Sequence, residues 1–97
     1  SELRLRTEIQ TTLDQWLTAN TEVASFNQTI LPAAQSAVDT ATRGFEMGKF
    51  NFLDVLDAQR TLISARTQYI QAIAEATDAW VRIERIFGDV AILTRTP

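Results

Sequence analysis

The chain has 97 residues, 45% of them hydrophobic, and a net charge of −3, which suits either one small domain or a part of an assembly. It has no cysteine and no histidine, so disulfides, thiolate nucleophiles, histidine bases and Cys/His zinc sites are excluded. The scattered, mildly acidic charge offers no basic stripe to nucleic acid, and no apolar run approaches the ~20 residues of a membrane-spanning helix. We therefore expect no catalytic residue, no metal site, no cofactor and no membrane span in this chain.

The first predicted helix covers about residues 2–47. Its apolar residues recur every three or four positions along two adjacent stripes, which is typical of a coiled-coil-like helix with neighbours on two sides. Pro32 is the only interior proline; because it lacks a backbone N–H and crowds the preceding turn, we expect a kink or short break near residues 29–32. The stripes are Leu13, Trp16, Val23, Ile30, Ala34, Ala37 and Ala41, and Leu17, Ala24, Leu31, Val38 and Phe45.

A short reversal, the tip, is predicted at about residues 48–51. Gly48 suits a left-handed cap at the end of the first helix. Asn51 can cap the next helix, with Asp54 three residues later as in a capping box. Four apolar side chains surround this turn, and they either staple the hairpin end or meet a partner: Phe45, Met47, Phe50 and Phe52.

The second predicted helix covers about residues 52–86 and is followed by a tail, residues 87–97. One heptad stripe is unbroken, with alanines that allow close approach of a neighbour: Val55, Ala58, Leu62, Ala65, Tyr69, Ala72, Ala76, Ala79, Ile83 and Ile86. A second stripe lies on another flank: Phe52, Leu56, Ile63, Ile70, Ile73 and Trp80. The fold class is therefore all-α, one long antiparallel hairpin over residues 1–97. Since a hairpin covers one apolar stripe of each helix, something outside the hairpin must cover the second.

The stretch "GFEMGKFNFLDVLDAQRTLISARTQYIQA", followed by "IERIFGD", resembles the C-terminal repeat of the TolC-like outer-membrane efflux proteins. The segment "GKFNFLDVLDAQRTL" is most similar to the sequences of their heavy-metal-resistance branch, which exports ions such as cobalt, zinc, cadmium or copper. The resemblance implies a homotrimer whose periplasmic hairpins form an α-barrel below the outer membrane, with this tip at the entrance. It also implies a passive conduit that works with a periplasmic adaptor and an inner-membrane pump.

The resemblance also assigns roles to the residues of the turn. The aromatic residue of the family's tip matches Phe45, and its glycine matches Gly48. Met47, Lys49 and Asn51 complete the turn. This turn is the part of the hairpin that the resemblance places against the adaptor.

Four residues are expected at the pore entrance. Some relatives hold the entrance shut with a polar lock of tyrosine and arginine, whose positions here are Phe45 and Phe50, so the resemblance implies apolar closure instead. Asp54 and Asp57 match acidic positions that narrow the entrance in several relatives. Acidic residues near the N-terminus of a helix, as both of these are, are equally explained by the helix dipole.

Two other functions are compatible with parts of the pattern. A soluble coiled-coil interaction module, such as the hairpin of a periplasmic adaptor, would use the same heptads. Adaptors carry a tip pattern with arginine, leucine and serine, which "EMGKFNF" lacks. A carboxylate-bridged metal enzyme in a helical bundle needs a Glu-x-x-His motif, which a chain without histidine cannot supply. We therefore do not expect an enzyme.

Overall fold

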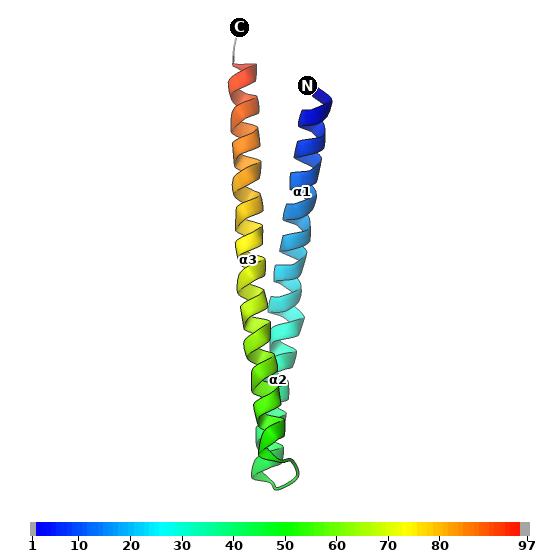
Figure 1. Cartoon of the computed structure of the whole chain (residues 1–97), viewed down its shortest axis with the longest axis vertical. Helices are drawn as coiled ribbons and strands as arrows, with labels where there is room; N and C mark the ends of the chain where they lie inside the picture. Colours follow the sequence, from blue (N-terminus) through cyan, green and yellow to red (C-terminus); the bar gives the residue numbers. More distant parts are fainter. Residues whose placement is uncertain (1, 96–97) are drawn as a thin grey trace.

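The computed structural model describes residues 2–95, which form one antiparallel helical hairpin with dimensions of 77 × 19 × 16 Å. Both ends of the chain lie at one end of the rod and the turn lies at the other (Figure 1). The elements are α1 (Glu2–Ser25), the π-helix η1 (Phe26–Ile30), α2 (Leu31–Glu46) and α3 (Phe52–Thr94). The predicted all-α hairpin is confirmed. Within residues 2–95, no helical segment combines the length and hydropathy that crossing a bilayer requires.

The last helix is longer than the sequence suggested. We expected it to end near residue 86, but α3 continues to Thr94, so most of the predicted tail is helical. A single glycine, Gly88, costs a helix only about 1 kcal/mol, and a Cβ at that position would meet no other atom. No proline interrupts residues 87–94, so the backbone hydrogen-bond ladder continues. Residues 1, 96 and 97 of the predicted domain lie outside the described residues.

The predicted heptad stripe of α3 forms the contact with the rest of the hairpin. Seven of its residues are buried, and Ala58, Tyr69 and Ala76 between them are half-buried. The alanines let the partner helix approach closely, because a small side chain leaves no ridge between the two backbones. The buried seven are Val55, Leu62, Ala65, Ala72, Ala79, Ile83 and Ile86.

Aromatic and polar contacts fix α1 against α3. The rings of Trp16 and Trp80 lie 5.6 Å apart, in a tilted arrangement that adds to simple burial. Arg82 donates from Nη1 to the Gln15 side-chain oxygen over 3.1 Å and also pairs with Asp78 on its own helix. These contacts set the register of α1 on α3 near the open end of the hairpin.

The residues of α1, η1 and α2 that pack against α3 follow two heptad patterns, and the second pattern is offset from the first by one residue. Up to and including Phe26, the first residue of η1, the buried and half-buried positions include Leu5, Ile9, Thr12, Trp16, Ala19, Val23 and Phe26; after η1 they include Leu31, Ala34, Val38 and Ala41. The first predicted stripe is partly wrong: Ile30 and Ala37 are exposed, whereas Thr12 and Ala19, which neither predicted stripe includes, are buried. Five residues, instead of four, separate Phe26 from Leu31. Each residue of α2 that packs on α3 therefore stands one residue later than the heptad pattern of α1 would place it.

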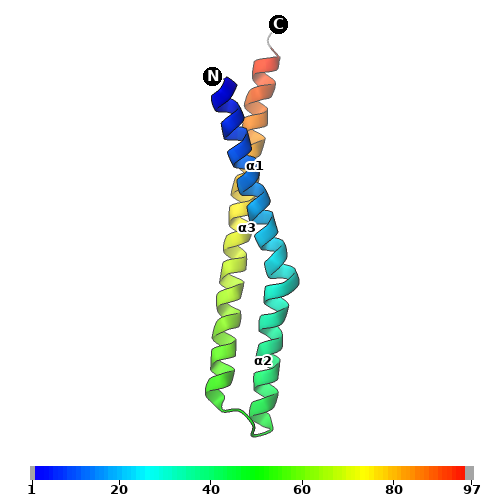
Figure 2. The ribbon, with the colours of Figure 1, turned by 90° about the vertical axis from the view of Figure 1, so that its right-hand side faces the viewer.

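The π-helix has an identifiable cause. The Leu31 N–H donates to the Phe26 carbonyl, five residues back, instead of four. In a regular α-helix the ring of Pro32 would collide with the carbonyl four residues earlier, and the wider π turn relieves this crowding. The predicted kink near residues 29–32 is therefore confirmed as an irregularity, centred slightly earlier in the chain. Figure 2 shows α1 and α2 meeting at an angle there.

Most of the second stripe of α3 remains exposed, as the sequence indicated, although Leu56 is half-buried and Trp80 contacts Trp16. Ile63 and Ile70 are 61% and 66% exposed, and Trp80 is about half exposed. Phe87 continues the same row beyond the predicted helix end and is 54% exposed. An apolar row of this length along a helix marks a surface that associates with another protein segment.

We predict that the 97-residue chain self-associates through this row at micromolar concentrations. Ile63→Gln/Ile70→Gln should weaken association about tenfold or more, because two exposed isoleucines lose their burial in the complex. Light scattering over a concentration series measures the change, and Ser64→Gln, at an exposed position roughly 100° round α3 from this row, is the control. A chain that stays monomeric at high micromolar concentration would contradict the prediction.

Candidate functional site

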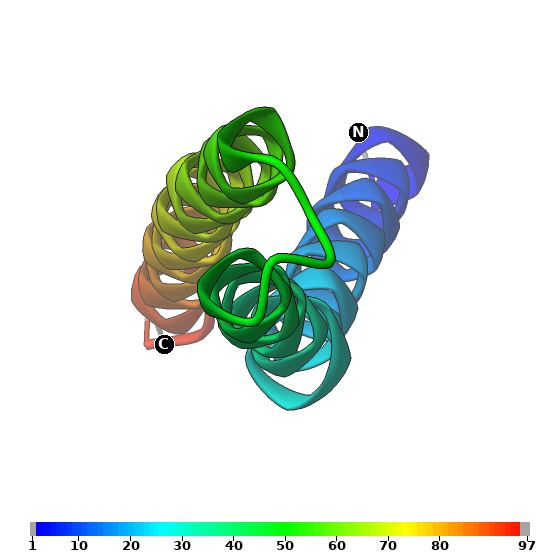
Figure 3. The same ribbon diagram turned by 90° about the horizontal axis from the view of Figure 1, so that it is seen from below.

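The tip is built by a complete helix-ending motif. Gly48 has φ +73°, so the predicted left-handed cap is confirmed. Its N–H donates to the Phe45 carbonyl over 3.0 Å, and the Lys49 N–H donates to the Gly44 carbonyl over 2.8 Å. This is the double hydrogen bond of a Schellman motif, which satisfies carbonyls that the end of α2 would otherwise leave without partners. The turn occupies residues 47–51, and Figure 3 shows it bridging the ends of α2 and α3.

Gly44 leaves room for the ring of Phe50, a role that the sequence pattern did not reveal. The ring of Phe50 lies directly on it: a Cβ added to Gly44 would stand only 2.0 Å from the Phe50 Cδ2 atom. The Phe50 N–H also donates to the Gly44 carbonyl over 3.1 Å. Gly44 is buried as a result, and the absence of a side chain there allows the ring to fold back onto its own hairpin.

The start of α3 carries the predicted capping box. The Asn51 side-chain oxygen accepts from the Asp54 N–H over 3.2 Å, and the Asp54 carboxylate accepts from the Asn51 N–H over 3.1 Å. Two backbone donors at the helix start are thereby satisfied. Asp54 has a structural role in the turn whatever else it does.

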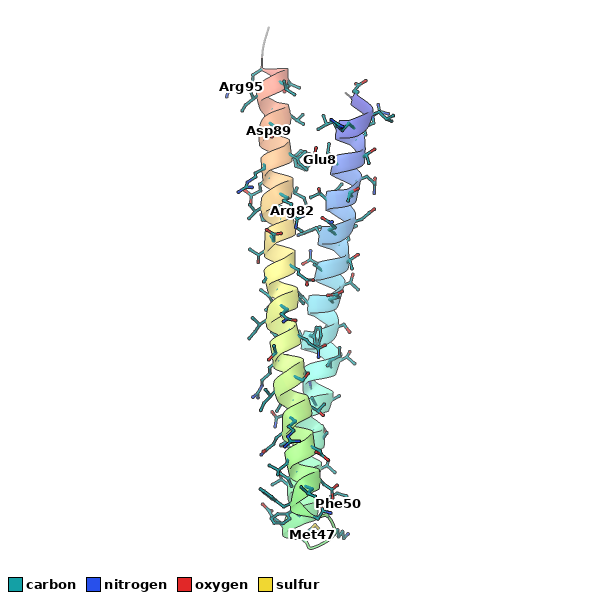
Figure 4. All side chains as sticks on the ribbon, in the orientation of Figure 1. Glu8, Met47, Phe50, Arg82, Asp89 and Arg95 are labelled. Carbon is teal, nitrogen blue, oxygen red and sulfur yellow. The ribbon has the colours of Figure 1, made fainter. Side chains whose placement is uncertain are left out.

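A cluster of apolar side chains surrounds the turn and stays largely exposed. The rings of Phe45 and Phe52 lie 5.5 Å apart across the hairpin, which closes its end as a staple would. Met47 is 66% exposed, and Figure 4 shows it with Phe50 at the very end of the rod. We call this set the tip patch; its members, each at least 44% exposed, are Phe45, Met47, Phe50, Phe52 and Leu53. Leu53 was not singled out from the sequence, because it lies on neither stripe.

The two acidic residues share one face of α3 next to the patch. Asp54 and Asp57 are three positions apart and both exposed, so their carboxylates lie on successive turns of the same face. Asp54 also borders, with Phe50, a groove along the small side chains of α2: Ala33, Ser36, Ala37, Thr40 and Ala41. Lys49 and Asn51, the remaining predicted tip residues, are exposed in the turn.

This arrangement provides contact surface, and nothing in it is poised for covalent chemistry. Among residues 2–95, no three acidic, histidine or cysteine side chains come together as a metal site requires. The predicted tip residues are all brought together at one end of the hairpin, where apolar side chains and two carboxylates face outward. Such a surface can dock a partner or border an aqueous passage.

Comparison with known proteins agrees with this architecture. Residues 1–89 match the profile of the family described as outer membrane efflux protein. A relative, the cobalt-zinc-cadmium resistance protein CzcC of Cupriavidus metallidurans, is 52% identical over 64 residues; the match covers 66% of this chain and 15% of the relative's length. No solved structure shows significant similarity to the chain. These matches confirm the resemblance inferred from the tip motif, including its heavy-metal-resistance branch. The chain therefore belongs to the outer membrane efflux protein family.

Proposed function

We propose that this hairpin is a segment of the periplasmic α-barrel of an outer-membrane channel that exports heavy-metal ions. The barrel is built by a homotrimer of the parent protein, and the conduit is passive. A periplasmic adaptor joins it to an inner-membrane pump, which supplies the energy. The metal assignment is supported by the likeness to a cobalt-zinc-cadmium resistance protein.

The observation that carries the proposal is the pair of apolar surfaces on one hairpin. The buried stripe of α3 holds α1 and α2, while the stripe with Ile63 and Ile70 stays exposed. In a barrel every helix has neighbours on two sides, so both stripes are covered. A hairpin that functioned alone would keep an unfavourable apolar row in water.

The tip is the entrance of this conduit in our proposal. Phe45 and Phe50 close it through apolar contacts, since neither side chain can form a hydrogen-bonded lock. Asp54 and Asp57 line the opening and favour cations. The adaptor docks on the turn, where Gly48 and Asn51 set the backbone path and the side chains of Met47 and Lys49 are exposed.

Metal tolerance of cells tests the proposal. Deleting the full-length gene should make the cells more sensitive to cobalt, zinc or cadmium, and the wild-type gene should restore tolerance. Met47→Asp should restore it poorly, because a charge in the centre of the tip patch opposes apolar docking. Met47 lies in the turn and is mostly exposed, so the hairpin itself should fold normally.

Ser64→Asp is the matched control, since it adds the same charge at an exposed position of α3 away from the turn. Crosslinking of the adaptor to the channel should fall with Met47→Asp and persist with Ser64→Asp. Unchanged metal tolerance after gene deletion would refute the metal assignment. Full restoration by Met47→Asp, with normal adaptor crosslinking, would refute docking at the turn.

A further inference from the structure

We propose that η1 is a register switch: the π-helix allows α2 to contact α3 through either of two adjacent faces, and a change of face rearranges the tip. The switch itself is inferred from the hairpin alone. Its consequence, control of the entrance, rests on the proposed function.

The first step is that α1 and α2 contact α3 in different registers. Trp16 and Gln15 hold α1 on α3 through Trp80 and Arg82. If η1 were α-helical, α2 would turn about its axis by one residue, which is about 100°. The extra residue in η1 is therefore what selects the face that α2 presents now.

The second step is that α2 carries another usable face. Continuing the heptad pattern of α1 without the extra residue would place five small or apolar residues against α3: Ile30, Ala33, Ala37, Thr40 and Gly44. Three of them, Ala33, Ala37 and Thr40, line the groove that runs beside buried Ala41 toward the tip. Neither face has a bulky polar residue that would forbid the contact.

The third step is that the two faces differ modestly in apolar content. The present face buries Leu31 and Val38 around Ala34, whereas the rotated face would bury Ile30 and Thr40 instead. Pro32 also favours the present state, because its ring fits the π turn better than an α-helix. Both differences favour the present packing, so in this proposal the rotated packing is the minor state, which a ligand that binds it more tightly can populate.

The fourth step is that the tip depends on which face is used. The Gly44 carbonyl accepts from both Lys49 and Phe50, and the Phe50 ring covers Gly44. Rotating α2 turns Gly44 toward α3 and carries Phe45 away from Phe52. The Phe50 ring would be displaced from Gly44 in the rotated register, because α3 would then occupy that side of α2, so the tip patch must rearrange.

Disulfide trapping tests the switch. The experiment uses a cysteine-free version of the full-length protein in the membranes of transporting cells. Ala34→Cys/Ala65→Cys reports the present register, because both positions lie in one buried cluster. Ala33→Cys/Ala65→Cys reports the rotated one, since Ala33 is now exposed. We expect a high yield from the first pair and a low but measurable yield from the second, rising several-fold with Pro32→Ala.

A variant that cannot switch provides the second measurement. Deleting Asn27 in a Pro32→Ala background removes the extra residue, so a continuous α-helix keeps the present register. This variant should abolish the Ala33/Ala65 disulfide, retain the Ala34/Ala65 disulfide and lose metal tolerance, while Pro32→Ala alone should keep tolerance.

Absence of the Ala33/Ala65 disulfide from both wild type and Pro32→Ala would overturn the switch. Wild-type tolerance in a deletion variant that retains the Ala34/Ala65 disulfide would overturn its role in the entrance. If cells lacking the whole protein kept their metal tolerance, the proposed function would fail instead, and the disulfide yields would still decide the switch.

Discussion

Replacing Gly44 by alanine should destabilise the hairpin by about 1–3 kcal/mol, the usual effect of forcing extra atoms into filled space. The same substitution within an ordinary helix stabilises it by about 1 kcal/mol, since glycine loses more backbone entropy on folding. The sign is reversed here because the new Cβ would stand 2.0 Å from the Phe50 ring. The ring would have to leave the backbone of α2, and the turn would lose its internal support.

A double-mutant cycle isolates this contact. With Phe50→Ala already present, Gly44→Ala should become neutral or stabilising, by up to about 1 kcal/mol, because nothing then occupies the space above residue 44. Urea unfolding followed by helical circular dichroism measures all four free energies. Equal effects of Gly44→Ala in both backgrounds would show that the Phe50 ring does not depend on Gly44.

The Phe50 contact also bears on how the tip closes. The resemblance to the TolC-like proteins implies that Phe50 stands at the position of a lock residue. In the structure its ring covers its own hairpin and leaves about half of its surface exposed. The exposed half can meet an apolar neighbour without breaking the turn. In the proposed trimer, closure would then bring together prefolded tips, with no need for hydrogen bonds between them.

The sequence predicted α3 well and the first half of the hairpin less well, for a physical reason. The heptad positions of α3 follow one uninterrupted α-helix, so the row from Val55 to Ile86 could be read directly. In the first half, both Ile30 and Leu31 are apolar, so a one-residue offset leaves the count of apolar positions almost unchanged. Pro32 signalled an irregularity, but whether the helix would kink, break or widen depends on which faces must meet α3.

At the tip, local chemistry was predictable and contacts in space were not. Gly48, Asn51 and Asp54 act through backbone atoms within a few residues, so their spacing was sufficient to assign the cap and the capping box. Gly44 depends on where the Phe50 ring folds, which follows from the path of the whole turn. Leu53 joins the tip patch because the first turn of α3 orients it outward.

Asp57→Asn should lower the preference of the full-length channel for cations, while leaving the stability of the hairpin nearly unchanged. In the proposed trimer, three copies of Asp57 face the entrance, and a ring of carboxylates attracts cations and repels anions. Asp57 is exposed on α3 and takes no part in the capping box, so its substitution changes charge without disturbing the turn. Single-channel recording in a salt gradient measures the preference.

Asn51→Ala is the informative counterpart, because it breaks the capping box and keeps both carboxylates. It should cost about 1 kcal/mol of stability, as the loss of an N-cap does, and leave the cation preference close to that of the wild type. Asp54→Asn should show both effects, since Asp54 belongs to the cap and to the acidic face.

If Asp57→Asn leaves the preference for cations unchanged, the carboxylates of this face do not line the conduit, and Asp54 is a capping residue alone. A shift in preference with Asp57→Asn and none with Asn51→Ala would assign the effect to charge at the entrance, independent of the fold of the turn.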